Sequence, residues 1–314
     1  MSASRPAVVS IVGSLSINYH FKVDSLPAIG ETVAADRLDV LRGGKGGNEA
    51  IAVARQGCVA HLFGAVGNDE PGLTYRTALK DEGVKIDHLN AINSKTGTSV
   101  ITRDPQGNET IVSVGGANDY LARDDVRKGA RVIEGSHALL GQFEVTSGPL
   151  IEAADLANRS GTPVIFHASP FRPAFPFGDV KVDHVIASFA EALELLEFDP
   201  LVEGESATRQ RLHEMRIDTL LVTRGAKDTL VYERTAGLFS VPTLPVLPID
   251  TTGASDAFAG CFAARIAQRE PLEDAVKAAN CAGALVCLGR GAQDPIADRD
   301  KVDQHREQLN AQTV

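Results

Sequence analysis

The segment Asp250-Thr251-Thr252-Gly253-Ala254-Ser255-Asp256, followed directly by the apolar run 257–266, predicts an extended stretch, a glycine turn and the start of a helix. A helix N-terminus presents unpaired N–H groups and a partial positive charge, so it favours an anion such as phosphate. A carboxylate held there can accept a proton from an attacking hydroxyl, which suits phosphoryl transfer to an alcohol. Asp and Ser are also common helix N-caps, so the segment alone is equally consistent with a capped helix.

The amino-acid composition restricts which classes of protein and partner fit this chain. The chain has 314 residues, of which 43% are hydrophobic and 23% charged, as is ordinary for a globular protein. Its net charge of −10 argues against a nucleic-acid backbone or an anionic membrane surface as the main partner. A local basic pocket for a nucleotide stays compatible with that charge. Trp is absent and aromatic residues make up 5%, so a platform for stacking single strands is not expected.

Two features of the sequence indicate the cellular compartment: the spacing of the cysteines and the character of the N-terminus. The four cysteines form no CxxC pair, so we expect buried thiols in a reducing cytosol rather than a metal or redox site. The N-terminus lacks the basic region of a secretory signal, and no uninterrupted apolar run reaches membrane-spanning length. We therefore expect a cytoplasmic protein.

Short β-branched runs alternate with helical windows along most of the chain, beginning with a strand at 7–12. This alternation predicts an α/β fold with a mainly parallel sheet and helices on both faces. Further strands are expected at 59–66, 137–140, 163–167, 184–187 and 219–222, with a hairpin at 229–233 and 238–241. The clearest helices are expected at 48–57, 72–82, 254–268, 272–288 and about 300–309.

Two groups of more polar strands interrupt this pattern. Residues 15–42 contain short alternating pieces, and 98–103 and 109–114 flank a turn at 104–108, which reads as a hairpin. We expect the two groups to pair as a small sheet that forms a flap over the main body. The prediction is one domain, 1–314, with a β lid inserted from about 15–42 and 97–114.

A second glycine cluster, Arg42-Gly43-Gly44-Lys45-Gly46-Gly47-Asn48-Glu49, precedes the helix at 48–57. A glycine-rich turn ahead of a helix indicates close approach of the backbone to a ligand. It is neither a P-loop, because Gly46 follows the lysine, nor the dinucleotide fingerprint, which must follow a first strand directly. Alone, the cluster is also consistent with a tight turn and a solvated lysine.

Together the two clusters resemble the two motifs of the ribokinase (PfkB) carbohydrate kinase family, Gly-Gly-Lys-Gly-x-Asn at 43–48 and Asp-Thr-x-Gly-Ala-x-Asp at 250–256. The likeness covers nearly the whole chain, including Gly13-Ser14 and the Gly291-Ala292-Gln293 segment. It implies a ribokinase-like three-layer sandwich with a small β lid. It also implies transfer of the γ-phosphoryl group of ATP to a hydroxymethyl group, with Mg²⁺.

The resemblance assigns roles by position. Asp256 would be the base, and the N–H groups of Gly253, Ala254 and Ser255 would form the anion hole. The sugar site would be lined by Ser16, Asn18, Gly44, Lys45, Asn48 and Glu144. The nucleotide site would include Thr223, Gly225, Lys227 and Asn280. Glu191 would organise Mg²⁺ through water, and Asp250, Thr252 and Gly291 resemble part of a loop that binds a monovalent cation such as K⁺.

Four positions depart from the family pattern. Ser16 and Asn18 stand where an Asn and an Asp grip ribose hydroxyls, and Asn18 can donate as well as accept. Ser188 replaces the Asn of the Asn-x-x-Glu motif. Ser255 replaces a glycine, which would cost about 1–2 kcal/mol if that residue needs positive φ. Pro295 replaces a small polar residue near the cation loop, so K⁺ dependence is left open.

Three functions remain in competition. The leading one is an ATP-dependent kinase of a small, ribose-like sugar. The alternative is a nucleoside kinase, which needs an apolar wall for the base, so Tyr19, Phe21 and 112–114 would decide it. The third is a catalytically weak binding protein on the same scaffold, suggested by Ser188 and Ser255. A small sheet with exposed edges tends to be covered or paired. The family resemblance implies dimerisation through the lid, so we also expect a homodimer.

Overall fold

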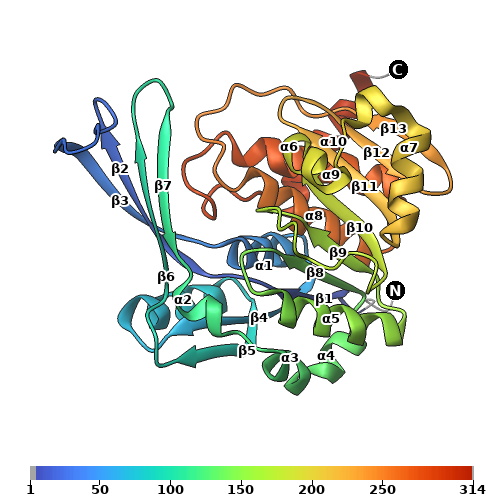
Figure 1. Cartoon of the computed structure of the whole chain (residues 1–314), viewed down its shortest axis with the longest axis horizontal. Helices are drawn as coiled ribbons and strands as arrows, with labels where there is room; N and C mark the ends of the chain where they lie inside the picture. Colours follow the sequence, from blue (N-terminus) through green and yellow to red (C-terminus); the bar gives the residue numbers. More distant parts are fainter. Residues whose placement is uncertain (1–4, 313–314) are drawn as a thin grey trace.

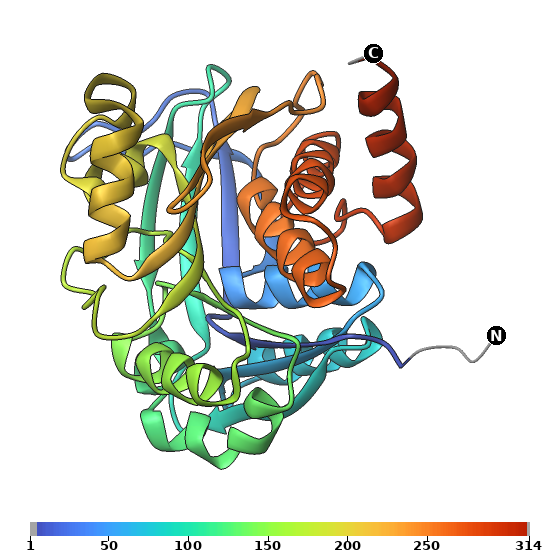
Figure 2. The ribbon, with the colours of Figure 1, turned by 90° about the vertical axis from the view of Figure 1, so that its right-hand side faces the viewer.

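The computed structural model describes residues 5–312 of the chain. Within them, nine strands form a central sheet in the order β13-β12-β11-β10-β9-β8-β1-β4-β5 (Figure 1). Their bounds are β1 (Val8–Val12), β4 (Val59–Gly67), β5 (Lys85–Ile92), β8 (Ala138–Gln142), β9 (Val164–His167), β10 (Val182–Ser188), β11 (Ile217–Arg224), β12 (Lys227–Glu233) and β13 (Gly237–Val241). Neighbouring strands are parallel from β5 to β11, and β12 and β13 add antiparallel. Figure 2 shows the sheet with helices on both sides.

Helices cover both faces of this sheet, which confirms the predicted α/β architecture. One face carries α1 (Lys45–Arg55), α2 (Glu70–Asp81), α8 (Ala254–Ala267) and α9 (Leu272–Val286), with α10 (Arg299–Gln312) packed on α9. The other face carries α3 (Arg123–Lys128), α4 (Ala130–Glu134), α5 (Ser147–Ser160), α6 (Phe189–Leu196) and α7 (Pro200–Glu214). A 3₁₀ helix, η1 (Gly116–Tyr120), precedes α3.

The two faces have separate hydrophobic cores. Val9 and Ile11 of β1 belong to the core under α1 and α8, whereas Val12 belongs to the core under α5. Successive side chains of a strand point to opposite faces, so a strand buried on both sides reads as a continuous apolar run. This explains why β1 and its neighbours were recognisable from the sequence.

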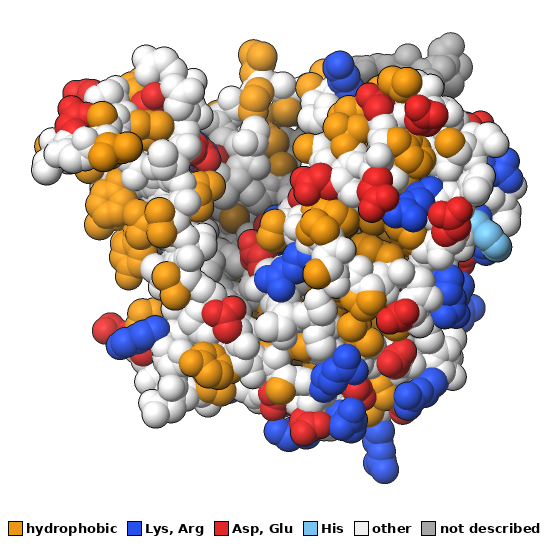
Figure 3. All heavy atoms as spheres, in the orientation of Figure 1, with side chains coloured by type: hydrophobic (Ala, Val, Ile, Leu, Met, Phe, Trp, Pro, Cys, Tyr) orange, Lys and Arg blue, Asp and Glu red, His pale blue; other side chains and the backbone are white. Residues whose placement is uncertain are grey.

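A second sheet in the order β3-β2-β6-β7 stands away from the main body (Figure 1). It consists of β2 (Ser16–Val23), β3 (Ala35–Gly43), β6 (Gly97–Arg103) and β7 (Glu109–Val114), and β2 pairs with β6 in parallel. The two polar strand groups therefore pair as predicted. The outer face of this sheet is apolar (Figure 3), with exposed Leu38, Val40, Val100, Val112 and Val114.

Some details differ from the sequence prediction. Strand β5 is not among the predicted elements, because Lys85–Ile92 buries only Ile86 and Leu89, three residues apart, and so lacks the period-two pattern of a strand. Helix α1 begins at Lys45, three residues before the predicted start at 48, because Gly46 and Gly47 lie inside the helix. All four cysteines are free and buried, as expected. In the part of the chain that the structure describes, we find no helix with the length and apolar character needed to cross a bilayer.

Candidate active site

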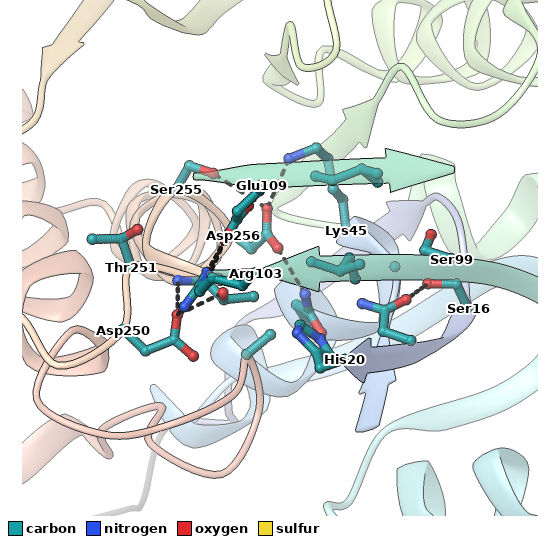
Figure 4. Close-up of a pocket in the computed structure, with 18 of the residues that line it drawn as sticks. Ser16, His20, Lys45, Ser99, Arg103, Glu109, Asp250, Thr251, Ser255 and Asp256 are labelled. Atoms are coloured by element: carbon teal, nitrogen blue, oxygen red, sulfur yellow. Dashed lines mark hydrogen bonds and ion pairs between the residues drawn. The ribbon is translucent and has the colours of Figure 1, made fainter. Parts of the chain in front are cut away.

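Two adjoining cavities flank the N-terminus of α8. The larger, of about 730 Å³, lies between this helix end and the inner face of the second sheet (Figure 4). The smaller, of about 340 Å³, lies between the loop 243–251 and helices α8 and α9. Pro248, Thr251 and Ser255 line both cavities, so the two spaces meet at the turn before α8.

Asp256, in the first turn of α8, lies in the wall of the larger cavity and is 4% exposed. Its Oδ2 accepts a hydrogen bond from Asn48 Nδ2 at 2.7 Å, and its Oδ1 lies 3.3 Å from Lys45 Nζ. Burial raises the pKa of the Asp256 carboxyl, but the Lys45 ammonium and the hydrogen bond from Asn48 act in the opposite direction, and the pKa falls below its usual value. The carboxylate is therefore ionised and able to accept a proton.

The turn before α8 requires a glycine. Gly253 has φ +81°, and a Cβ there would lie 2.8 Å from the Cα of Ala292. Its left-handed backbone lets the chain enter α8 beside the 290s loop. The Ala254 N–H, one of the three predicted anion-hole donors, already donates a hydrogen bond to the Thr251 carbonyl oxygen at 3.2 Å. Gly253 and Ser255 line the larger cavity.

Ser255 needs no left-handed conformation. It lies inside α8, and the non-glycine residues with positive φ in the described chain are Glu197, Arg216 and Arg269. The strain considered from the sequence therefore does not arise. Its Oγ lies 3.4 Å from Asp256 Oδ1, at the junction of the two cavities. The hydroxyl is available as an additional donor there.

The structure brings the six predicted sugar-site residues to the larger cavity. Glu144 accepts hydrogen bonds from the Ser14 hydroxyl and from the backbone N–H of Lys45, at 3.1 Å for the latter. Asn18 Oδ1 accepts from Ser16 Oγ at 2.8 Å. The lining residues among the predicted set are Ser16, Asn18, Gly44, Lys45, Asn48 and Glu144.

Other residues of the larger cavity were missed. His20, Ser99, Arg103 and Glu109 reach it from the second sheet. The period-two alternation that places Ser16 and Asn18 on one face also places His20 there, so this signal was present in the sequence. The ion pair between Arg103 and Glu109 joins two strands and had no comparable signal.

The smaller cavity contains three of the four predicted nucleotide residues, Thr223, Gly225 and Asn280. The Asn280 amide is used inside the protein: its Oδ1 accepts from Thr229 Oγ1 at 2.7 Å, and its Nδ2 donates to the carbonyls of Val241 and Pro242. Lys227 starts β12, is exposed, and is not among the residues that line this space. Apolar lining comes from Leu244, Val246, Phe258 and Ala284.

Glu191 caps α6. Its carboxylate accepts from the backbone N–H of Ser188 at 2.8 Å, and Ser188 Oγ accepts from the Glu191 N–H. This reciprocal arrangement is a capping box, in which a serine at 188 is favourable. Burial raises the pKa of Glu191, but hydrogen bonds from Ser169 and Ser188 outweigh this effect and bring the pKa below its usual value, so the group is ionised. An ionised carboxylate suits contact with Mg²⁺ through water, although Glu191 lines neither cavity.

Asp250 faces hydrogen-bond donors. Its Oδ1 accepts from the Thr252 N–H at 3.1 Å and hydroxyl at 2.7 Å, and its Oδ2 accepts from the Gly291 N–H at 3.0 Å. Arg103 of the second sheet lies 3.4 Å from Oδ1 (Figure 4). These hydrogen bonds use the N–H groups of Thr252 and Gly291 and leave their carbonyl oxygens uninvolved. The monovalent-cation site therefore stays a prediction.

The comparisons with known proteins agree with this geometry. The profile of the pfkB family carbohydrate kinases matches residues 7–299. The ribokinase of Bacillus subtilis is 29% identical over 297 residues, covering 94% of this chain and 98% of that protein. The ribokinase of Haemophilus influenzae is 27% identical over 296 residues, covering 93% and 96%.

Solved structures show the same fold. The structure of Arabidopsis thaliana ribokinase complexed with ribose and ATP has a TM-score of 0.84 and 25% identity, covering 96% of this chain and 99% of that one. The predicted ribokinase-like fold is thus confirmed. The match of the family profile over most of the length shows that this chain belongs to the pfkB family of carbohydrate kinases and is a phosphotransferase.

Proposed function

We propose that the protein transfers the γ-phosphoryl group of ATP to a hydroxymethyl group of a ribose-like sugar. The observation that carries this proposal is the ionised, buried Asp256 at the head of α8, where the two cavities meet. A sugar in the larger cavity and a nucleotide in the smaller one would bring hydroxyl and phosphate together at this turn. The resemblance to ribokinases over more than nine-tenths of the chain supports the same assignment.

In the proposed reaction, Asp256 accepts the proton of the attacking hydroxyl. The O–H bond breaks as the new oxygen–phosphorus bond forms, and the bond from γ-phosphorus to the β-phosphate bridging oxygen breaks to release ADP. The N–H groups of Gly253 and Ser255 stabilise the transferred group, together with the N-terminus of α8. Lys45, 3.3 Å from Asp256, keeps the base ionised until the proton moves.

When Mg²⁺ is bound with ATP, it neutralises part of the negative charge of the phosphates. In our proposal Glu191 takes part through water, because it is ionised and its other contacts are hydrogen bonds to Ser169 and Ser188. A site for K⁺ stays a prediction from the family resemblance. The Asp250 carboxylate already accepts from Thr252 and Gly291 and pairs with Arg103, so carbonyl oxygens of the same loop would supply most of the ligands.

The side chains of the second sheet support a sugar as the acceptor. Ser16, Asn18, Ser99 and Ser113 face the larger cavity and can bind hydroxyl groups. The nucleoside alternative depends on Tyr19, Phe21 and 112–114. Of these residues, only Ser113 lines the larger cavity, and it offers a hydroxyl rather than an apolar wall. In this proposal the second sheet is the lid of the sugar site.

A nucleoside remains the second candidate because three apolar side chains also line the larger cavity. Ile101, Ile111 and Ile249 could contact a base while the sugar lies near Asp256. A base stacked there would be partly exposed, since Ile111 is 60% exposed. A panel of acceptors separates the two functions.

The test uses purified protein with Mg-ATP, and ADP release is measured for pentoses, hexoses and nucleosides with and without K⁺. We expect turnover with a free sugar, and the comparison with and without K⁺ tests the predicted monovalent-cation site. Preference for inosine or adenosine over free ribose would establish the nucleoside alternative. Ligand-dependent thermal stabilisation without turnover on any acceptor would identify a binding protein instead.

The apolar outer face of the second sheet supports a homodimer. This face is formed by the strand pairs β2–β3 and β6–β7. Its exposed apolar side chains are Leu38, Val40, Val100, Val112 and Val114. A contiguous apolar patch of this kind marks an interaction surface. We propose that two copies pair through this face, and light scattering that shows a monomer at micromolar concentration would exclude it.

A further inference from the structure

Two ionisable side chains lie behind Asp256 and take no part in the proposed reaction. Glu49 on α1 is 0% exposed, and His167 at the end of β9 is 2% exposed. Glu49 Oε1 lies 2.9 Å from His167 Nδ1, which in turn lies 3.9 Å from Asp256 Oδ1. The second oxygen of Glu49, Oε2, is buried and has no hydrogen-bond partner among the described residues.

This geometry favours an uncharged pair. An ionised carboxylate that is fully buried with one unpartnered oxygen is unfavourable, because nothing replaces the water that it has lost. Burial and the neighbouring Asp256 raise the pKa of Glu49 well above its usual value, and burial lowers the pKa of His167. One proton then joins the two side chains: the Glu49 carboxyl donates to Nδ1, and the imidazole carries its own proton on Nε2.

We propose that Glu49 and His167 are positioning residues for Asp256, acting as one uncharged hydrogen-bonded pair that supports the base from behind. The proposal rests on the proposed function, since it takes Asp256 as the base. An ionised Glu49 would place a second negative charge beside Asp256, and an imidazolium would stabilise its charge and weaken its affinity for a proton. The uncharged pair leaves the Lys45 ammonium as the cation in contact with the base.

The charged groups around the pair come from several elements. Lys45 lies on α1, Asp256 on α8, Glu191 on α6, and Glu144 follows β8. Ligand atoms of Glu49, His167 and Asp256 lie within 4.8 Å of one another, which is also a possible spacing for a metal ion. Lys45 Nζ already lies 3.3 Å from Asp256 Oδ1, so a divalent cation there would meet a like charge.

Two substitutions at Glu49 test the positioning role. Glu49→Gln keeps the shape, is always neutral, and can donate its amide N–H to His167 Nδ1. We expect its kcat to stay within about threefold of wild type and the acid limb of its kcat profile to coincide with wild type. Glu49→Ala removes the support, so we expect kcat to fall about tenfold or more with the sugar KM nearly unchanged.

Either of two results would overturn the proposal. One is an acid limb in Glu49→Gln displaced by about one pH unit, because that shift means that Glu49 carried a charge in the wild type. The other is wild-type kcat in a folded Glu49→Ala protein. Circular dichroism checks the fold, and if Glu49→Ala does not fold, the Glu49→Gln profile decides.

A spectroscopic measurement tests the protonation state of His167 without any turnover. A negative result there therefore contradicts the uncharged pair and leaves the proposed function untouched. In protein labelled with ¹⁵N-histidine, the His167 signals are assigned from their loss in His167→Gln. We expect an unprotonated Nδ1 and a protonated Nε2 at neutral pH. An imidazolium, or a stoichiometric transition metal retained after dialysis against EDTA, would overturn the proposal.

Discussion

Substitution of Asp256→Asn removes the proposed base while it keeps the shape of the side chain. Positioned general bases contribute about 10²–10⁴-fold, so we expect kcat to fall by that factor, equivalent to about 3–5.5 kcal/mol in the activation barrier. Asp256 lines the larger cavity, whereas the lining of the smaller one includes its neighbour Ser255. The affinity for ATP should therefore stay close to wild type.

The same substitution has a defined effect on the local hydrogen bonds. Asp256 accepts from Asn48 Nδ2 and from Lys45 Nζ through different oxygens. An amide has a single oxygen, so one of these donors loses its acceptor, at a cost of about 1.5–3 kcal/mol for a charged group. Removal of a buried negative charge offsets part of this cost. We therefore expect a folded protein whose loss is catalytic.

The assay is coupled ADP release at saturating sugar, with ATP binding measured by calorimetry and folding by urea denaturation. Asp124→Asn is the matched control, because the Asp124 side chain forms an exposed ion pair with Arg127 on α3 and lines neither cavity. The control should keep wild-type turnover. A kcat for Asp256→Asn within about tenfold of wild type would refute the assignment of the base.

Three further substitutions test the surroundings of the base. Gly253→Ala should lower the free energy of unfolding in urea by about 1–2 kcal/mol from its φ of +81° alone, with a further loss from contact with Ala292. Lys45→Met removes a charge that lowers the pKa of Asp256, so the acid limb of the kcat profile should move to higher pH. The depressed pKa also stabilises the folded protein at pH values above the ordinary carboxyl pKa, and this stabilisation is lost as the pH falls. Lys45→Met should therefore make the free energy of unfolding depend less on pH, as measured in a series of unfolding curves. Arg103→Met breaks a half-exposed ion pair with Asp250. In steady-state assays, we expect the KM for the sugar to rise by at most about fivefold and to depend less on salt concentration than in the wild type.

The central sheet was predictable because its strands are buried on both faces. β1 and β4 appear in the sequence as short, nearly continuous apolar runs. Gly57 and Gly83, with φ of +81° and +80°, follow α1 and α2 and separate these helices from the next strands. Asp256 was predictable for a different reason. Its glycine turn, carboxylate and apolar helix are consecutive in the chain, so local sequence contains the whole feature.

The contacts that depend on distant segments were not predictable. Glu49 follows Asn48 on α1 and meets His167, 118 residues later, only because α1 packs against the ends of the strands. Asp250 resembled a cation ligand, but its oxygens face the Gly291 N–H and Arg103, which tertiary structure brings there. Local propensity contains no information on these pairings.

The geometry around Asp256 depends on the two glycines inside α1. A Cβ at Gly46 would lie 2.5 Å from the carbonyl carbon of Gly13, and one at Gly47 would meet the Tyr75 hydroxyl at 2.1 Å. Glycine at 46 and 47 therefore lets the first turn of α1 pack directly against the loop after β1, although glycine weakens a helix interior by about 1 kcal/mol per residue.

That close packing determines which residues reach the base. Residues three and four positions apart lie on one face of a helix, so Lys45, Asn48 and Glu49 project together from the first turn of α1. Lys45 and Asn48 contact the two oxygens of Asp256, and Glu49 reaches His167 behind it. Any side chain at 46 or 47 would move Lys45, Asn48 and Glu49 outward. The position of the two glycines is thus explained by the contacts that these residues make around Asp256, more than two hundred residues away.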